Sequence, residues 1–235
     1  MKQKPSGARE KISVLNEAIV TLSANRADLY TGLVRKEGLK KALVHSTIEL
    51  YHKAQKYNRI YQRFSFRYGS MEGPHERAYD KARNLTRERA VLAASITHAA
   101  IRLGIPVTPL YVSDRMGMYA PDVRKVFTHM ENGLSLGTVI PFPHEYVVFY
   151  SELLGIGDER TRRALTLLRG LEKSDGRFSA MNINNVVLAA TSIVLVGTGT
   201  GRLDLCYSMG VSEGSVRAAQ QVFTNFGITA LLQKV

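Results

Sequence analysis

Residues 203–223 read LDLCYSMGVSEGSVRAAQQVF, and this stretch predicts two helices joined by a tight turn. The first helix should end at Met209, because Gly210 can adopt the left-handed backbone conformation that closes a helix. Ser212 can cap the second helix by accepting a hydrogen bond from the N–H two or three residues further on. Glu213 follows the cap, where the positive end of the helix dipole favours a carboxylate. The pattern is typical of a helix-turn-helix.

The second helix of such a unit offers its N-terminal residues to the major groove of DNA. Arg217, Ser215 and Gly214 lie in that part of the predicted helix, and Arg217 can bond guanine O6 and N7 with two N–H groups. Ser212 at the cap is a further candidate for DNA contact, and Arg202 is a candidate for the flanking backbone. The alternative interpretation is that a short turn simply joins two core helices.

The second half of the chain repeats features of the first half. The matches are Leu92-Ala93-Ala94 with Leu188-Ala189-Ala190 at an offset of 96, and Met116-Gly117 and Val123-Arg124 with Met209-Gly210 and Val216-Arg217 at an offset of 93. Two copies at such a spacing indicate a duplicated helical domain and not a solenoid. We expect a leader and first helix over 1–22, copies at about 23–136 and 141–227, and a linker from Gly133 to Pro143.

Residues 114–130, DRMGMYAPDVRKVFTHM, are the counterpart of the turn in the first copy. Arg124 repeats Arg217, whereas Lys125 has no matching base in the second copy. One copy can therefore read bases while the other holds phosphates or a protein. A solvated helix face is the competing interpretation.

Apolar spacing and composition predict an all-α globular protein. Apolar residues recur every three or four positions, and sustained period-two alternation is missing from the sequence. The 235 residues are 45% hydrophobic, which excludes disorder for most of the chain. One cysteine, Cys206, excludes a disulfide framework, and no apolar run has the length of a membrane span. We therefore expect a soluble protein in a reducing compartment.

The charge is strongly positive and uneven. The net charge is +12, and residues 1–100 alone carry +10. This balance favours nucleic acid or an acidic surface as the partner. Arginines also interleave with aromatic residues in YNRIYQRFSFRY, residues 57–68, which suits single-stranded nucleic acid or an amphipathic helix with snorkelling arginines. Residues 57–84 look like an insertion in the first copy.

Catalytic and metal-binding patterns are weak, so we expect no catalytic residue, cofactor or metal. His45, Glu49 and His52 share one helix face and could hold a metal, but this spacing is common by chance. The glycine-rich GTGTG, residues 197–201, follows an apolar run and imitates a phosphate loop. Arg202 stands where a dinucleotide motif needs its third glycine. We interpret 186–196 as a close-packed helix and GTGTG as the loop that follows it.

Taken together, these features resemble the paired cyclin-like repeats of general transcription factor IIB. Each copy has an Ala-rich third helix, LAASITHAAIRLGIP or LAATSIVLV, and a closing Met-Gly-x5-Val-Arg helix pair. Residues 146–154, YVVFYSELL, resemble the start of the family's second repeat, and Gly176-Arg177 resembles its Gly-Arg before the third helix. Gly104-Ile105-Pro106 is similar to the Gly-Val-Pro of the first repeat.

The resemblance implies two tandem five-helix repeats in a non-enzymatic transcription initiation factor of the nucleus, or of the cytoplasm for an archaeal or viral relative. Such a core binds the TATA-binding protein on promoter DNA and helps recruit RNA polymerase. A membrane is not among its expected partners. Arg217 falls on the family's base-contacting Arg. Gly214 falls where the family carries an apolar contact, which puts base specificity in doubt.

The resemblance also implies contacts from basic residues to DNA or the TATA-binding protein. The family's paired lysines in the first repeat correspond to Ala120 and Pro121, and its first Gly-Arg corresponds to Leu85-Thr86. We therefore expect nearby basic residues to serve instead. The candidates are Arg83, Arg87, Arg124 and Lys125, together with Arg177, which matches the family's own Gly-Arg in the second repeat.

The family's amino-terminal zinc ribbon cannot be built from one cysteine, so the resemblance implies a truncated core or a ribbonless relative. Such divergence is similar to that of early-branching parasites such as trypanosomatids. The alternative function is a cyclin-type regulatory subunit of a protein kinase, which acts through the first repeat. A third class, a nicotinamide-dependent enzyme that uses GTGTG, requires strands.

Overall fold

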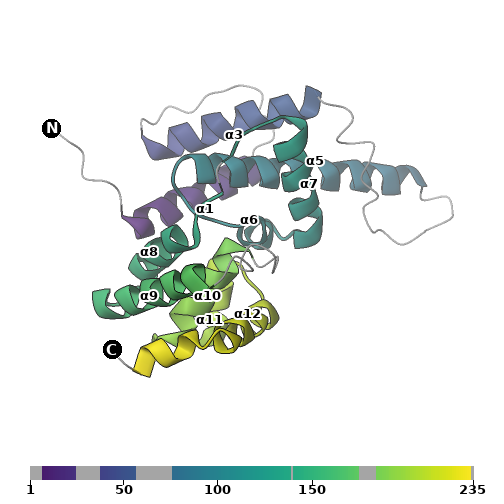
Figure 1. Cartoon of the computed structure of the whole chain (residues 1–235). Coiled ribbons are helices and arrows are strands. Elements are labelled where there is room, and N and C mark those ends of the chain that lie inside the picture. The colour runs from purple at the N-terminus through teal and green to yellow at the C-terminus, as the bar shows by residue number, and fades with distance from the viewer. Residues whose placement is uncertain (1–6, 25–37, 57–75, 139, 175–183, 234–235) are drawn as a thin grey trace. The chain divides into compact units, whose positions relative to one another are not determined.

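A computed structural model describes residues 7–24, 38–56, 76–138, 140–174 and 184–233, with only the backbone for 76–86 and 231–233. Every regular element in these ranges is helical, which confirms the all-α prediction (Figure 1). The α-helices are α1 (Ala8–Ala24), α3 (Leu39–Lys56), α5 (Glu76–Arg102), α6 (Pro109–Arg115), α7 (Ala120–Gly133), α8 (Pro143–Leu154), α9 (Asp158–Ser174), α10 (Asn185–Leu195), α11 (Arg202–Met209) and α12 (Glu213–Asn225), and a 3-10 helix, η2, covers Ile228–Gln233.

The chain divides into two compact units, which we call the N-terminal unit (12–139) and the C-terminal unit (140–235 together with 1–11). α1 begins at Ala8, inside the range 1–22 in which we expect a leader and first helix. The Ala8 N–H donates to the Glu152 carboxylate at 2.8 Å within the C-terminal unit. This contact satisfies one of the donors that a helix leaves free at its start.

The N-terminal unit is built around α5. Residues 90–101 of this helix are all buried, and α3, α6 and α7 pack against it (Figure 1). A helix that is apolar on all sides belongs inside a core. Two of its buried hydroxyls form hydrogen bonds within the helix, because Ser95 and Thr97 donate to the carbonyls of Val91 and Ala93, one turn earlier.

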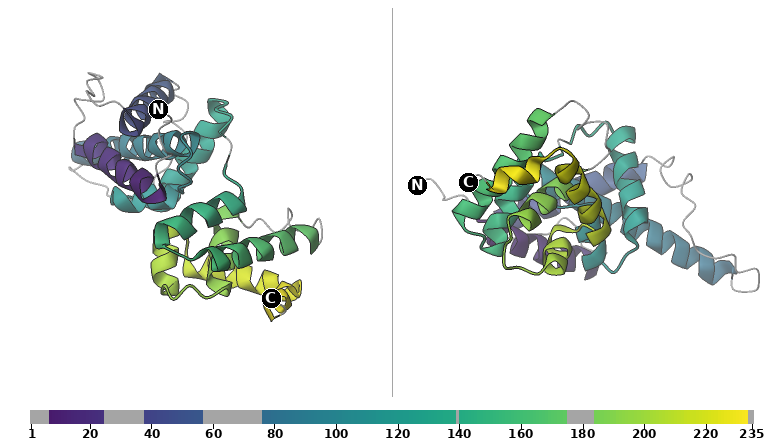
Figure 2. Two further views of the ribbon diagram at one scale, coloured as in Figure 1. Left: turned by 90° about the vertical axis from the view of Figure 1, so that its left-hand side faces the viewer. Right: turned by 60° about the horizontal axis from the view of Figure 1, so that its bottom comes forward.

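The C-terminal unit is built in the same way around α10. Residues 186–193 are all buried, and α8, α9, α11 and α12 pack against the helix (Figure 2). Thr191 and Ser192 donate to the carbonyls of Val187 and Leu188. The apolar run before GTGTG is therefore a helix, as predicted, and not the strand that a nucleotide-binding loop would follow.

The predicted insertion over 57–84 contains the start of a helix. α5 begins within it, at Glu76, and runs without a break into its buried part. Residues 76–102 contain neither Gly nor Pro and are rich in Ala and Arg, which both favour helix. Residues 57–75, including the arginine–aromatic stretch, lie outside the described residues.

Candidate nucleic-acid interface

The turn between α11 and α12 has the conformation that the sequence predicts. The first helix ends at Met209, and Gly210 follows with φ 62° and ψ 50°. The Val211 N–H donates to the Cys206 carbonyl at 2.9 Å, which is the closing bond of a Schellman motif. Val211 is buried, so the turn is fixed to the core of the C-terminal unit.

The predicted cap of α12 is also present. The Ser215 N–H donates to Ser212 Oγ at 3.1 Å, and the two hydroxyl oxygens lie 2.7 Å apart. Both serines are exposed. Ser212 therefore fixes where α12 starts, and one serine hydroxyl donates to the other in the free protein.

The same turn occurs in the N-terminal unit at the offset of 93 residues. Gly117 has φ 61°, and the Met118 N–H donates to the Ser113 carbonyl at 2.8 Å. Met116 and Val123 are buried, as are their counterparts in the C-terminal unit. The sequence match between the two halves thus corresponds to a match in backbone conformation and hydrogen bonding.

The two turns differ in how the following helix begins. Tyr119 occupies the cap position of α7 and makes no side-chain cap bond, whereas Ser212 makes one in the C-terminal unit. Pro121 lies in the first turn of α7, where its missing N–H costs no helical bond. The surface presented by α7 is therefore chemically different from that of α12.

Two arginines meet one carboxylate at the start of α12. Arg217 Nη2 lies 2.8 Å from Glu213 Oε1, and Arg202 Nη1 lies 3.7 Å from the same oxygen. The side chains of Arg217 and Arg202 are 65% and 40% exposed. The cluster keeps a net charge of +1 at the surface. The spacing of four between Glu213 and Arg217 is typical of such a pair on one helix face, although it was not among the sequence predictions.

Gly214 stands beside this cluster in the first turn of α12. A Cβ at this position would meet nothing within 4 Å. The backbone of Gly214 does not require glycine either, since its φ is outside the left-handed region. The position is open, and a larger side chain would extend from it into solvent.

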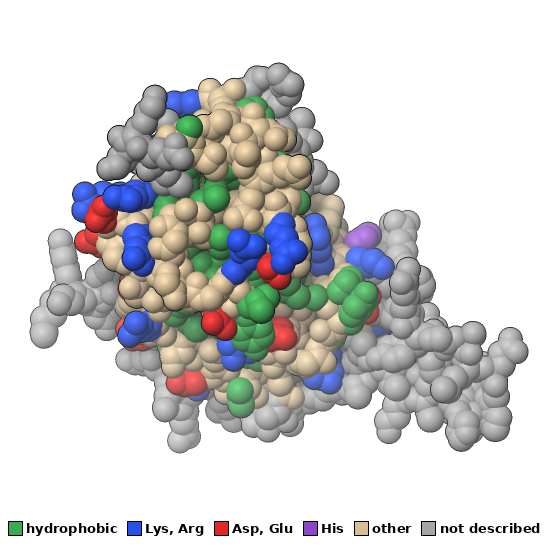
Figure 3. Space-filling view, turned by 90° about the horizontal axis from the view of Figure 1, so that it is seen from below, with side chains coloured by type: hydrophobic (Ala, Val, Ile, Leu, Met, Phe, Trp, Pro, Cys, Tyr) green, Lys and Arg blue, Asp and Glu red, His purple; other side chains and the backbone are tan. Residues whose placement is uncertain are grey.

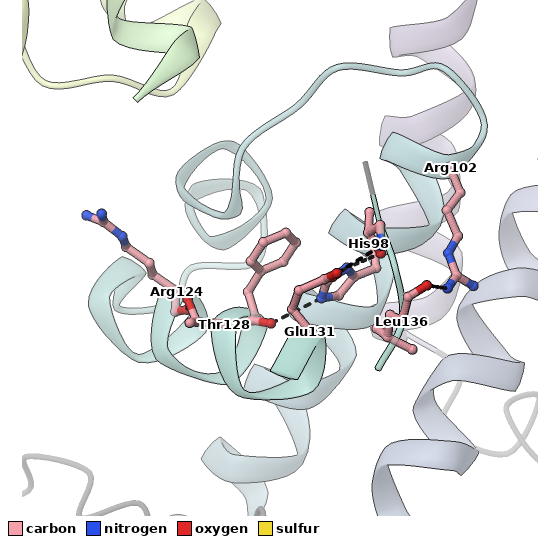
Figure 4. Close-up of polar contacts among 8 residues, drawn as sticks. His98, Arg102, Arg124, Thr128, Glu131 and Leu136 are labelled. Carbon is pink, nitrogen blue, oxygen red and sulfur yellow. Dashed lines mark hydrogen bonds and ion pairs between the residues drawn. The ribbon is translucent and has the colours of Figure 1, made fainter. Parts of the chain in front are cut away.

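The candidate contacts in the N-terminal unit differ in exposure. Arg124 and Lys125 are exposed on α7, and Arg124 points away from the core (Figure 4). Arg87 is partly buried on α5. The side chain of Arg83 lies outside the described residues, as does the whole of Arg177, the candidate of this group in the C-terminal unit. Arg124 and Lys125 are therefore the candidates in this unit whose side chains are shown to be exposed.

Basic side chains do not form one continuous patch on the face that Figure 3 displays. Lys and Arg side chains there are interspersed with acidic and hydrophobic ones. Such a surface suits a few defined contacts to an anionic partner better than broad electrostatic adhesion.

The structure also reveals a buried polar cluster that the sequence analysis missed. His98 Nε2 lies 3.2 Å from the Phe127 carbonyl oxygen, and Nδ1 lies 3.1 Å from Thr138 Oγ1 (Figure 4). A carbonyl only accepts, so Nε2 carries the proton and Nδ1 accepts from Thr138. The imidazole is stacked on the Phe127 ring, with centroids 3.9 Å apart. The cluster fastens residue 138 to α5 and α7.

Burial lowers the pKa of His98 below its ordinary value, because the charged imidazolium would lose its hydration. The Phe127 carbonyl and Glu131 act in the opposite direction, and Arg102 adds to the lowering. Glu131 Oε2 lies 3.4 Å from Nδ1, but this contact is an ion pair only when His98 is protonated. We take His98 as neutral, since burial is the largest effect.

The His45, Glu49 and His52 face of α3 does not form a metal site. Glu49 pairs with Lys53 at 2.6 Å, and no group of three metal-ligating side chains occurs among the described residues. Within the same residues, no helix is long and apolar enough to cross a bilayer.

Comparison with known proteins gives no identification. The chain matches no model of a known protein family, and no curated protein sequence matches it. The assignment of function therefore depends on the residues and the geometry described above.

Proposed function

We propose that the chain is the core of a transcription initiation factor of the factor IIB type, with two tandem cyclin-like repeats. Three features support the proposal. Every regular element of the described residues is helical, each unit has a central helix with a stretch buried on all sides, and the same hydrogen-bonded turn recurs at an offset of 93 residues. On this proposal the protein binds the TATA-binding protein on promoter DNA and helps recruit RNA polymerase.

The observation that carries DNA binding is the start of α12. Ser212 fixes the first turn, and Arg217 extends from the same end of the helix with its side chain 65% exposed. An arginine at this place can approach guanine O6 and N7 with two N–H groups when the helix lies in the major groove. We assign Arg202, whose side chain is 40% exposed beside Glu213, to the flanking phosphates.

The start of α7 supports a second, different contact. Arg124 occupies the position equivalent to Arg217, and Lys125 is exposed beside it. Pro121 in the first turn and Tyr119 at the cap position, which makes no side-chain cap bond, give α7 a different surface from that of α12. We assign Arg124 and Lys125 to DNA phosphates or to an acidic surface of the TATA-binding protein.

The proposal predicts a sequence-dependent loss on Arg217→Ala. Fluorescence anisotropy with TATA-containing duplexes, in the presence of the TATA-binding protein, compares flanking sequences that differ at single guanines. The variant should lose about 1–3 kcal/mol on the preferred sequence and much less on the others. Arg169→Ala is the control, because Arg169 is an exposed arginine on α9 of the same unit.

Equal losses on all sequences would contradict base reading and make Arg217 a phosphate contact. Equal losses in Arg169→Ala would show that only total charge matters. Binding of a protein kinase, with no binding of DNA, would favour the cyclin-type alternative.

A further inference from the structure

Glu213 links the two arginines at the start of α12. It is the first residue of the helix, Arg217 lies one turn further on, and Arg202 begins α11. Glu213 Oε1 accepts a hydrogen bond from Arg217 Nη2 at 2.8 Å and lies 3.7 Å from Arg202 Nη1. One carboxylate oxygen therefore forms ion pairs with both guanidinium groups that the proposed function places against DNA.

The pair contributes little to the stability of the fold. Its arginine is 65% exposed and its glutamate 31% exposed, and ion pairs at such positions gain little over their hydrated, separate states. The pair does restrict Arg217, because one nitrogen is held while the guanidinium keeps four other N–H donors. A long side chain that would otherwise sample many rotamers is thereby biased toward one direction.

Close to DNA the same carboxylate has a cost. Its negative charge repels phosphates of any sequence and partly cancels the attraction of Arg202 and Arg217. Glu213 should therefore lower the affinity for all duplexes. Glu213 should also favour a duplex whose guanine lies where the oriented Arg217 guanidinium can bond to it.

We propose that Glu213 is a positioning residue that sets the base specificity of Arg217 and reduces non-specific binding by both arginines. This inference rests on the proposed DNA-binding function. Specificity is a difference between affinities, and a fixed repulsive charge next to a directed donor is a general way to increase it.

The test compares the wild type with Glu213→Gln and Glu213→Ala by anisotropy in the presence of the TATA-binding protein. Two TATA-containing duplexes are used, a preferred duplex and an unrelated duplex whose flanking sequence differs. Both variants should bind the unrelated duplex at least about threefold more tightly, because a repulsive charge is lost. The ratio between the two affinities should fall at least about fivefold, because Arg217 is no longer directed. Glu159→Gln is the matched control, since Glu159 forms the same i,i+4 pair with Arg163 at 2.5 Å on α9.

A double-mutant comparison separates positioning from simple charge. In an Arg217→Ala background, Glu213→Gln should still raise the affinity but should leave the ratio unchanged. The inference is overturned when Glu213→Gln keeps the wild-type ratio, or when Glu159→Gln lowers the ratio equally. A wild type that binds the two duplexes equally would overturn base reading by Arg217 itself. This result identifies a failure of the proposed function before any Glu213 variant is measured. Circular dichroism melting shows that each variant is folded.

Discussion

At the scale of single residues, His98 illustrates what the sequence leaves hidden. Its partners Phe127 and Thr138 are 29 and 40 residues away, so no local spacing indicates the cluster. Arg217 is the opposite case, because its role is predicted from its place after a helix start. Its pairing with Glu213 was also readable from a spacing of four residues, since such residues lie on the same face of a helix.

The buried His98 predicts that stability falls in mild acid. In the unfolded chain the imidazole has its ordinary pKa of about 6.5, whereas burial lowers the pKa in the folded protein. Below about pH 6.5 the unfolded state takes up a proton that the folded state does not, so the free energy of unfolding decreases. We expect a loss of about 1 kcal/mol between pH 7.5 and 5.5, measured from urea unfolding curves.

The control for this prediction is His98→Gln, which keeps a polar side chain but cannot titrate. Its unfolding free energy should change less with pH than that of the wild type. Equal pH dependence in the wild type and in His98→Gln would contradict the assignment of a neutral, buried imidazole.

At the scale of elements, local chemistry predicts boundaries where a cap or a glycine defines them. Met209, Gly210 and Ser212 end one helix and start the next as expected, because the reasons lie within a few residues. The sequence places 57–84 in an insertion without a predicted helix start, whereas α5 begins there at Glu76, because its residues favour helix. Charged composition alone does not separate an exposed helix from an insertion.

We expect alanine to have opposite effects at two glycines, one in the first turn of α12 and one that closes α11. Gly214→Ala should stabilise the protein by up to about 1 kcal/mol, because alanine favours helix and its Cβ meets nothing within 4 Å. Gly210→Ala should destabilise it by about 1–2 kcal/mol, because Gly210 has φ 62°. Circular dichroism melting measures both, and a lower melting temperature for Gly214→Ala would contradict the open position described for it.

At the scale of the whole molecule, the sequence predicts helices throughout and two similar halves, and the described residues are helical in both units. The buried stretches of α5 and α10, residues 90–101 and 186–193, are predictable because they consist mostly of apolar and small residues on every side. The charge of +12 indicates an anionic partner but cannot name it, because long-range attraction depends on the sum of charges. The partner is therefore a matter for direct measurement.

The most direct test is a gel-shift titration of a TATA-containing duplex with the TATA-binding protein, with and without this chain. The account predicts a further, slower complex that requires both proteins and weakens at higher salt, because phosphate contacts release counterions. A complex that never forms at any concentration or salt would contradict the initiation-factor proposal. It would direct attention to protein partners such as a kinase.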